Sequence, residues 1–248
     1  MNDGTQSLVL DNGRGRPSAE GRSLAVEAYG QIRRRIIECA LAPGQPFTEG
    51  LLVEEHGIGK TPVREALQRL AQEGLVQSIR RHGYRVAPIT LRDVRDLFGL
   101  RLILEPAGAE LAIGRIDLAR LREIQARYDA CYLDDPVAAV PFNTAFHLAS
   151  AQASGNARLA KTMAQLLSDS ERLYVFGFRF QSPGFQLGHM HEELIDAFAS
   201  GDPHYARECA VAQIVDAERM VTEALLHSPT LLDADVTLAG VNARPSGR

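Results

Sequence analysis

The sequence lacks several features that mark other classes of protein. No uninterrupted apolar run approaches the roughly 18 residues that a membrane-spanning helix needs. Residues 1–21 hold no apolar core of the length that a secretion signal requires. Only three cysteines occur, and they lie far apart, which favours a reducing compartment over a disulfide framework. From these absences we expect a globular protein of the cytoplasm.

Charge is distributed unevenly along the 248 residues, whose formal net charge is −4. Residues 22–88 carry ten Arg or Lys against seven Glu, or +3, whereas residues 89–248 carry fifteen basic against twenty-one acidic residues, or −6. A basic first part joined to an acidic second part is consistent with a nucleic-acid-binding head on a second module. A charge of +3 is a weak signal by itself, so the motifs have to decide.

The chain is long enough for two modest domains, each with its own core. We expect the first domain over residues 23–88 and the second over residues 89–227, joined at Pro88-Ile89-Thr90. Residues 1–22 are rich in Gly, Ser, Arg and Asn, and residues 228–248 are similar apart from a few leucines. We therefore expect both ends of the chain to be disordered.

The first domain has the pattern of a helix-turn-helix. Apolar residues at three- and four-residue steps predict a helix over about 24–39, and a short second helix is expected over about 49–56. A third helix is predicted to begin at Thr61-Pro62, with Thr61 as its N-cap and Pro62 at the first helical position. Its apolar face leaves four polar side chains outward at the N-terminal end, namely Lys60, Thr61, Arg64 and Gln68. A recognition helix presents such an edge to DNA.

Residues 75–86 predict a β-hairpin directly after the third helix. Its turn contains the basic residues Arg80, Arg81 and His82, followed by Gly83, which allows a close backbone approach. A solvated surface arginine or an ordinary charged hairpin explains each feature taken singly. The turn, the marked helix start and the basic hairpin together favour a winged helix-turn-helix that binds DNA.

Two motifs of this region resemble the GntR family of bacterial regulators. After Pro43-Gly44 the first is Gly57-Ile58-Gly59-Lys60-Thr61-Pro62-Val63-Arg64-Glu65-Ala66-Leu67, and the second is Glu73-Gly74-Leu75-Val76. The resemblance implies contacts from Lys60, Thr61 and Arg64 to an imperfect palindrome of double-stranded DNA, bound by a homodimer.

We expect Arg33, Gln68, Arg81, His82 and the Gly83 wing to complete the DNA-binding set. The family usually has Ser-Arg before Thr-Pro, where this chain has Gly59-Lys60. Lysine keeps the charge but lacks the bidentate fork that recognises guanine, so base specificity at this contact is expected to be relaxed or altered.

The second domain is expected to be an all-α antiparallel bundle, which makes the fold class mostly α. Apolar periodicity and Gly, Pro and Asp signals predict helices over about 91–112, 117–132, 136–154, 156–177, 184–200 and 203–226, the first capped by Thr90. Arg101-Leu102-Ile103-Leu104-Glu105-Pro106-Ala107, Phe146-His147 and His191 resemble the C-terminal ligand-binding domain, the FCD domain, of the FadR-type subgroup.

That resemblance implies a buried pocket for a small carboxylate effector. In the subgroup an Asp, a His four residues on and two later His hold a divalent metal such as zinc, and the matching positions here are Asn143, His147, His191 and Gln213. Neutral amides thus replace a carboxylate and an imidazole, which leaves His147 and His191 as the good metal donors. We favour a pocket lined by the two histidines without metal, and keep a weaker or different metal site as the alternative.

Arg101 resembles the family arginine that meets an effector carboxylate. A guanidinium inside a bundle needs such a partner or a protein acid. Glu105 lies four residues on, where it can pair with Arg101 along one helix. Contact with the effector and an internal salt bridge both stay open for Arg101.

The main hypothesis is a sequence-specific transcription regulator whose operator binding is controlled by the effector, through a change of dimer geometry at the joint near residue 88. One alternative is a metal-dependent enzyme using His147, His189 and His191. No acid–base pair, nucleophile elbow or phosphate loop accompanies them, so we do not expect an enzyme. A second alternative is an interaction bundle that has lost DNA binding, against which the Thr61-Pro62 and Arg64 pattern argues.

Overall fold

The computed structural model describes residues 19–180 and 190–228. Its first part, here called the winged domain, has three helices, α1 (Ala19–Ile37), α2 (Glu49–His56) and α3 (Lys60–Gln72). It also has a three-stranded antiparallel sheet of β1 (Pro46–Phe47), β2 (Val76–Ile79) and β3 (Gly83–Val86), with β3 in the centre. The predicted winged helix-turn-helix is confirmed, whereas the short strand β1 was not predicted.

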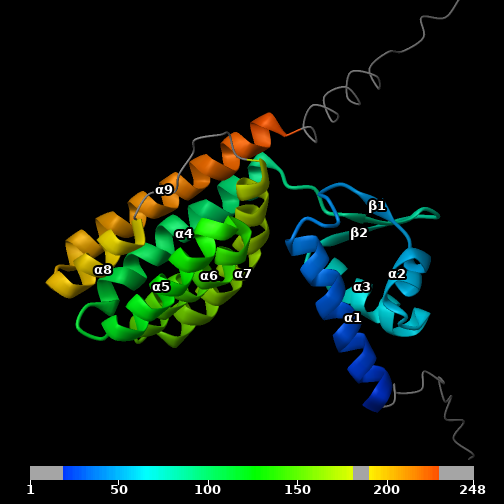
Figure 1. Cartoon of the computed structure of the whole chain (residues 1–248), viewed down its shortest axis with the longest axis horizontal. Helices are drawn as coiled ribbons and strands as arrows, with labels where there is room; N and C mark the ends of the chain where they lie inside the picture. Colours follow the sequence, from blue (N-terminus) through cyan, green and yellow to red (C-terminus); the bar gives the residue numbers. More distant parts are fainter. Residues whose placement is uncertain (1–18, 181–189, 229–248) are drawn as a thin grey trace, which may run out of the picture.

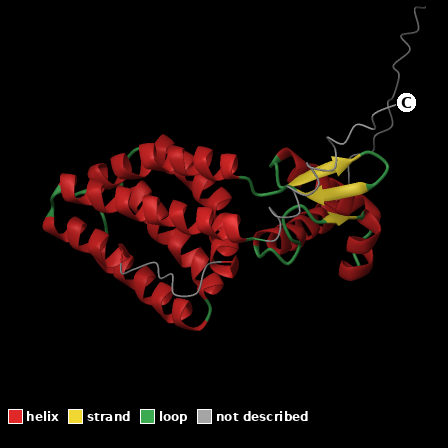
Figure 2. Cartoon of the chain, turned by 90° about the horizontal axis from the view of Figure 1, so that it is seen from above, coloured by secondary structure: helices red, strands yellow, loops and turns green. Residues whose placement is uncertain are grey.

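The second part is a bundle of six helices within the described residues. They are α4 (Leu91–Ala112), α5 (Leu118–Asp134), α6 (Pro136–Ala153), α7 (Ala157–Phe180), α8 (Met190–Ser200) and α9 (Pro203–His227). Figures 1 and 2 show the winged domain and the bundle as two lobes in both views. Helix α4 packs against α6, α7 and α9 with one face, while its other face is exposed. None of the helices within residues 19–180 and 190–228 has the combination of length and hydropathy that a membrane span requires.

The core of the winged domain follows from the spacing of apolar residues on α3. Val63, Ala66, Leu67 and Leu70 recur at helical steps and are all buried. They share one apolar cluster with side chains of α1, α2 and the sheet, such as Ile32. The polar side of α3 is thereby turned outward.

The N-caps of α3 and α4 differ in how well they match the predicted capping residues. The prediction of Thr61 as N-cap of α3 is wrong, because Gly59 holds that position without a side-chain cap. Pro62 is the third residue of the helix and not the first, as was predicted, but it still lies in the first turn, where its missing amide hydrogen has no helical partner to lose. The cap at Thr90 is confirmed: its hydroxyl accepts from the Asp93 amide, and the Asp93 carboxylate accepts from the Thr90 amide.

The ends of several elements differ from their predicted bounds. Helix α1 begins at Ala19, inside the segment that was expected to be disordered, and it ends at Ile37. The rest of that segment, residues 1–18, lies outside the described residues, as do residues 229–248 of the other predicted tail. Residues 184–189 of the predicted fifth bundle helix, with His189, are also outside them.

The two lobes touch through the end of α1 and the non-helical joint before α4. Ile37 and Ile89 belong to the apolar cluster of the bundle, not to that of the winged domain. Arg172, a buried residue of α7, donates a hydrogen bond to the carbonyl oxygen of Ala87 in the joint. The bundle therefore holds the segment that connects it to the winged domain.

Gly83, at the start of β3, generates the first prediction. Its φ is +91°, and a Cβ added there would lie 2.7 Å from the carbonyl oxygen of Phe47 in β1. The backbone that approaches Gly83 closely is thus that of β1 in the same domain. We expect Gly83→Ala to lower the free energy of unfolding by about 3 kcal/mol, because both the backbone angle and the β1–β3 pair are strained.

Gly44→Ala is the matched control for Gly83→Ala. Its φ is +79°, but a Cβ there meets nothing within 4 Å. Only the cost of a left-handed alanine remains, about 1 kcal/mol. Urea unfolding of both variants measures the difference, and equal losses would show that contact with β1 does not explain Gly83.

Candidate nucleic-acid interface and ligand pocket

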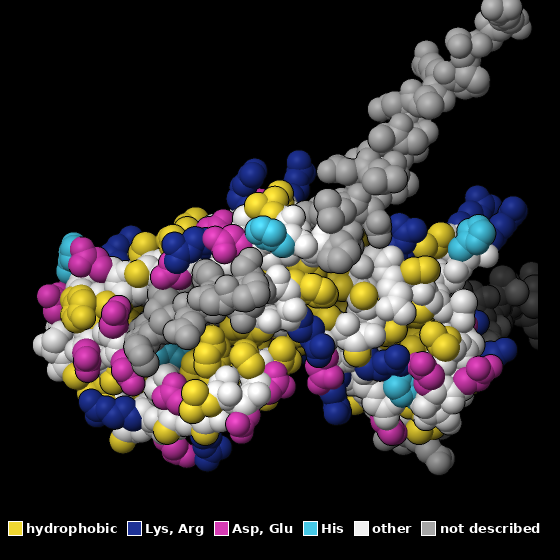
Figure 3. Space-filling model, turned by 45° about the horizontal axis from the view of Figure 1, so that its top comes forward, with side chains coloured by type: hydrophobic (Ala, Val, Ile, Leu, Met, Phe, Trp, Pro, Cys, Tyr) yellow, Lys and Arg dark blue, Asp and Glu magenta, His cyan; other side chains and the backbone are white. Residues whose placement is uncertain are grey.

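The polar end of α3 and the turn between β2 and β3 are exposed together on the winged domain. Lys60, Thr61, Arg64 and Gln68 are all exposed on α3. The turn residues Arg80, Arg81 and His82 are exposed as well. Figure 3 shows basic and histidine side chains gathered at the tip of this domain, at its end far from the bundle. This surface has the composition of a nucleic-acid interface.

Arg64 is oriented by an acid from the preceding helix. Its Nε and Nη2 donate to the two carboxylate oxygens of Glu49 at 3.1 and 2.9 Å. The hydroxyl of Tyr84, on β3, donates to the same carboxylate at 3.2 Å. The hydrogen bond from Arg64 is the main reason that the pKa of Glu49 is lowered, so Glu49 stays charged. Glu49 thus ties α2, α3 and the wing together, while the Arg64 side chain remains 58% exposed.

Arg33, which was predicted to contact DNA, lies elsewhere. Its Nη2 donates to Ser168 Oγ at 2.7 Å, and its Nη1 lies 3.8 Å from the Glu171 carboxylate, both on α7 of the bundle. Successive helical residues point about 100° apart, so three adjacent arginines cannot share one face. Arg35 accordingly pairs with Glu55 of α2. Arg33 therefore belongs to the contact between the winged domain and the bundle, and we no longer include it among the DNA-binding residues.

All five residues predicted for the effector site lie inside the bundle. Each is no more than 9% exposed. They are Arg101 on α4, Asn143 and His147 on α6, His191 on α8 and Gln213 on α9. The rings of His147 and His191 come together, with centroids 5.2 Å apart. Arg101, His147 and His191 therefore bring α4, α6 and α8 together in one polar region of the interior.

Arg101 forms an internal ion pair, the second of the two possibilities that the sequence left open. Its Nε and Nη2 donate to the carboxylate of Glu105 at 3.0–3.3 Å, and its Nη1 donates to the Tyr174 hydroxyl at 2.7 Å. Burial disfavours the charge of Arg101, but Glu105 and Tyr174 outweigh it, so the pKa of the guanidinium is raised. Arg101 is a buried, permanently positive group.

The two histidines are neutral. Burial, with the charge of Arg101 as a second cause, lowers the pKa of His147 to about 3. Burial and then His147 lower the pKa of His191 well below its usual value. The Nδ1 of His191 lies 2.7 Å from Gln125 Oε1, while Gln125 Nε2 donates to Asp129. Because that amide oxygen accepts, His191 carries its proton on Nδ1 and keeps a lone pair on Nε2.

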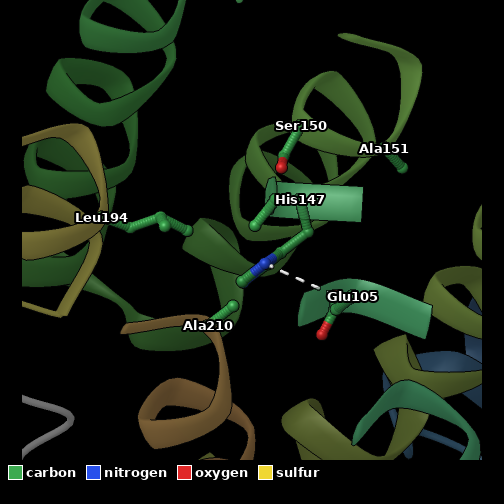
Figure 4. A pocket seen from close by; sticks show the side chains of 7 residues that line it. Glu105, His147, Ser150, Ala151, Leu194 and Ala210 are labelled. Atoms are coloured by element: carbon green, nitrogen blue, oxygen red, sulfur yellow. Dashed lines mark ion pairs between the residues drawn. The ribbon is translucent and has the colours of Figure 1, made fainter. Parts of the chain in front are cut away.

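A small cavity lies against this polar region. Glu105, His147 and Ser150 supply polar groups to its wall, and small or aliphatic side chains complete it: Ala109, Ala151, Leu194 and Ala210. Figure 4 shows His147 and Ser150 projecting from one helix, with the His147 ring facing Glu105. Its free space is about that of one water molecule, so a larger ligand has to displace part of the wall.

The donor set does not fit a tightly held metal ion. Asn143 and Gln213 offer neutral amides where a carboxylate and an imidazole would bind a cation strongly. The nearest carboxylate, Glu105, is held by Arg101, whose positive charge repels a second cation. Within residues 19–180 and 190–228, no three His, Cys, Asp or Glu side chains form a group that could hold a metal ion. We therefore assign no step to a metal.

Sequence reasoning missed three residues of this region. Ser150 follows His147 by three positions on α6, so helical spacing alone could have placed it on the same face. Gln125 and Tyr174 lie on α5 and α7, far from their partners in the sequence. No local signal points to them, because their role depends on how the helices pack.

Comparisons with known proteins agree with both halves of this description. The family model for bacterial regulatory proteins of the gntR family matches residues 24–86, and the FCD domain model matches residues 96–216. An HTH-type transcriptional regulator from an unstable DNA locus of Streptomyces ambofaciens is 27% identical, over 89% of this chain and 94% of its own length. The HTH-type transcriptional repressor RspR of Escherichia coli is 26% identical, over 71% of this chain and 79% of its own length.

A crystal structure of a putative GntR transcriptional regulator from Rhodococcus sp. RHA1 has a TM-score of 0.67 at 25% identity, covering 81% of this chain and 98% of that one. McbR/YncC of E. coli, at 21% identity and the same TM-score over 80% of this chain and 97% of that one, shares the fold. The two matched segments account for the winged domain and for most of the bundle. The chain thus belongs to the GntR family of transcriptional regulators, with an FCD domain behind its winged helix-turn-helix.

Proposed function

We propose that this regulator binds a palindromic operator as a homodimer, and that a small carboxylate in the bundle controls the binding. The observation that carries the proposal is the exposed polar end of α3 beside a basic wing, with Arg64 oriented by Glu49. We further propose that the chain acts by binding alone, without catalysis.

In this proposal the N-terminal end of α3 enters the major groove, where Lys60, Thr61, Arg64 and Gln68 reach base edges or phosphates. Arg81 and His82 of the wing approach the neighbouring backbone. Glu49 holds the Arg64 guanidinium by two of its N–H groups, which fixes its direction before DNA arrives. Such preorganisation reduces the entropy lost when the contact forms.

Selection of bound sequences from a random duplex pool at stated salt tests this interface. We expect the wild type to enrich a short palindrome, and Arg64→Ala to weaken binding to it about tenfold or more, since a good base contact is worth about 1–3 kcal/mol. Arg69→Ala is the matched control: this exposed arginine of α3 pairs with Glu73 and stacks over Tyr29. No enriched palindrome, or an equal loss in both variants, contradicts the proposal.

The proposed homodimer has a candidate surface on α4. Leu100, Ile103 and Leu111 are between 49% and 67% exposed, and with Ala107 they follow one another at steps of three and four residues. Residues so spaced lie on one face of a helix. An exposed apolar stripe is unfavourable in water and is typical of an interface, here with a second copy of the chain.

Light scattering of the purified chain tests this surface. We expect Ile103→Glu to shift a dimer towards monomer, because a carboxylate in the centre of an apolar interface loses its hydration without gaining a partner. The control is Leu133→Glu on α5, where the leucine is 86% exposed and lies off the stripe. The assignment fails if Ile103→Glu has the same mass as the wild type at every concentration.

Helix α7 is proposed to connect the pocket with the winged domain. Its Tyr174 accepts the hydrogen bond from Arg101, and its Arg172 donates to Ala87 in the joint. One turn earlier, Ser168 accepts from Arg33 of α1. A ligand that moves Arg101 therefore acts on the helix that holds the other lobe, and a ligand that binds two positions of this helix with different affinity shifts the balance between them.

Amide hydrogen exchange tests the hold of α7 on the joint. Arg172→Met keeps much of the side-chain volume but leaves the Ala87 carbonyl without its donor, so we expect exchange in the joint residues and the end of α1 to speed up about tenfold or more. Arg179→Met, an exposed residue of the same helix, is the control. Unchanged exchange in the joint would argue against transmission through this contact.

A further inference from the structure

The cavity is lined by the carboxylate of Glu105 and not by Arg101, the residue expected to bind an effector. Glu105 forms part of the cavity wall, whereas Arg101 is only 1% exposed and is not part of the wall. Both oxygens of Glu105 accept hydrogen bonds from Arg101, and Tyr174 takes a further guanidinium N–H. The position that an effector carboxylate would occupy on Arg101 is thus already filled from within the chain.

A second carboxylate cannot simply join this pair. Burial raises the pKa of Glu105, but the two-pronged contact with Arg101 opposes this and keeps the pair ionic, so the two charges cancel. The neighbouring rings of His147 and His191 are neutral. A ligand anion added to this set would be a buried, uncompensated negative charge, which is strongly unfavourable. Exchange avoids this when Glu105 takes up a proton from solvent as it leaves Arg101, because the displaced carboxylate would otherwise be the uncompensated charge. Once Glu105 has left Arg101, the effect of burial remains, and burial raises the pKa of this carboxyl.

We propose that Glu105 is the resident anion of the effector site, and that a carboxylate effector binds by taking its place on Arg101. This inference rests on the proposed function, since it takes the bundle as the effector domain. Glu105 then acts as an internal competitor that sets the affinity for effectors. Exchange also changes the set of partners around Arg101, and with it the contact to Tyr174 on α7.

The remainder of the wall defines the class of effector. Beside Glu105 the cavity presents the methyl groups of Ala109, Ala151 and Ala210, and the hydroxyl of Ser150. Outside this wall, the Nδ2 of Asn143, one turn before His147 on α6, is buried without a hydrogen-bond partner among the described residues. A short aliphatic carboxylate that carries a hydroxyl or carbonyl oxygen matches these groups, because the oxygen can accept from an amide or a hydroxyl.

Chemical rescue by acetate tests the exchange in the full-length chain. Glu105→Ala deletes the two carbons and two oxygens that make up acetate, and it leaves Arg101 without its anion. We expect Glu105→Ala to have a lower Tm than the wild type. Acetate should restore it saturably, by about 3 °C or more at roughly ten times its Kd for the variant, whereas the wild type, in which Glu105 competes for Arg101, should show no shift at the same concentrations. Acetamide, which has the same shape without the charge, and chloride at equal ionic strength should have no such effect.

Two variants separate exchange from a general salt effect. Glu105→Asp retains an anion and should ignore acetate, and Arg101→Met combined with Glu105→Ala lacks the cation and should ignore it too. If Glu105→Ala does not fold alone, the fraction that refolds from urea in acetate against acetamide gives the same comparison. The proposal is overturned if acetate and acetamide act alike, or if the double variant responds like Glu105→Ala. No DNA is present, so the result is independent of the operator selection.

Discussion

The positive charge of Arg101, buried inside the bundle, has to be compensated by the residues around it. A guanidinium cannot lose its charge, so its neighbours have to compensate for the hydration it gives up. Glu105 supplies the opposite charge from one turn away, and Tyr174 supplies a hydrogen-bond acceptor from α7. The same charge helps to keep His147 unprotonated. The positions of Glu105 and Tyr174 and the neutral state of His147 therefore all depend on Arg101.

Because Tyr174 lies on α7, the compensation of Arg101 has consequences outside the pocket. Two residues before it on the same helix, Arg172 binds the joint between the lobes, and Ser168 binds Arg33 at the back of the winged domain. These contacts lie within two turns of one helix, so a local rearrangement there can change the position of a lobe without unfolding either core. The DNA-facing end of α3 needs no direct contact with the effector.

Local signals predicted the elements well and the long-range contacts poorly. The Thr90 capping box and the apolar periods gave the bundle helices to within a few residues, since both depend on neighbours in sequence. They could not show that Arg33 faces the bundle, because three adjacent arginines look equivalent until α7 is placed against one of them. Strand β1 is only two residues long and contains proline, so it becomes a strand only by pairing with β3.

The departures from the subgroup pattern are consistent with the same charge balance. An aspartate at position 143 would add a carboxylate to an interior where the single charge of Arg101 is already matched by Glu105, and a bound cation would be needed to compensate it. Asparagine keeps the shape and adds no charge, and glutamine at position 213 likewise removes a metal-binding imidazole. Both substitutions leave a site that is neutral by itself. Under the proposed function, the guanidinium is then the group of this site that meets the effector anion.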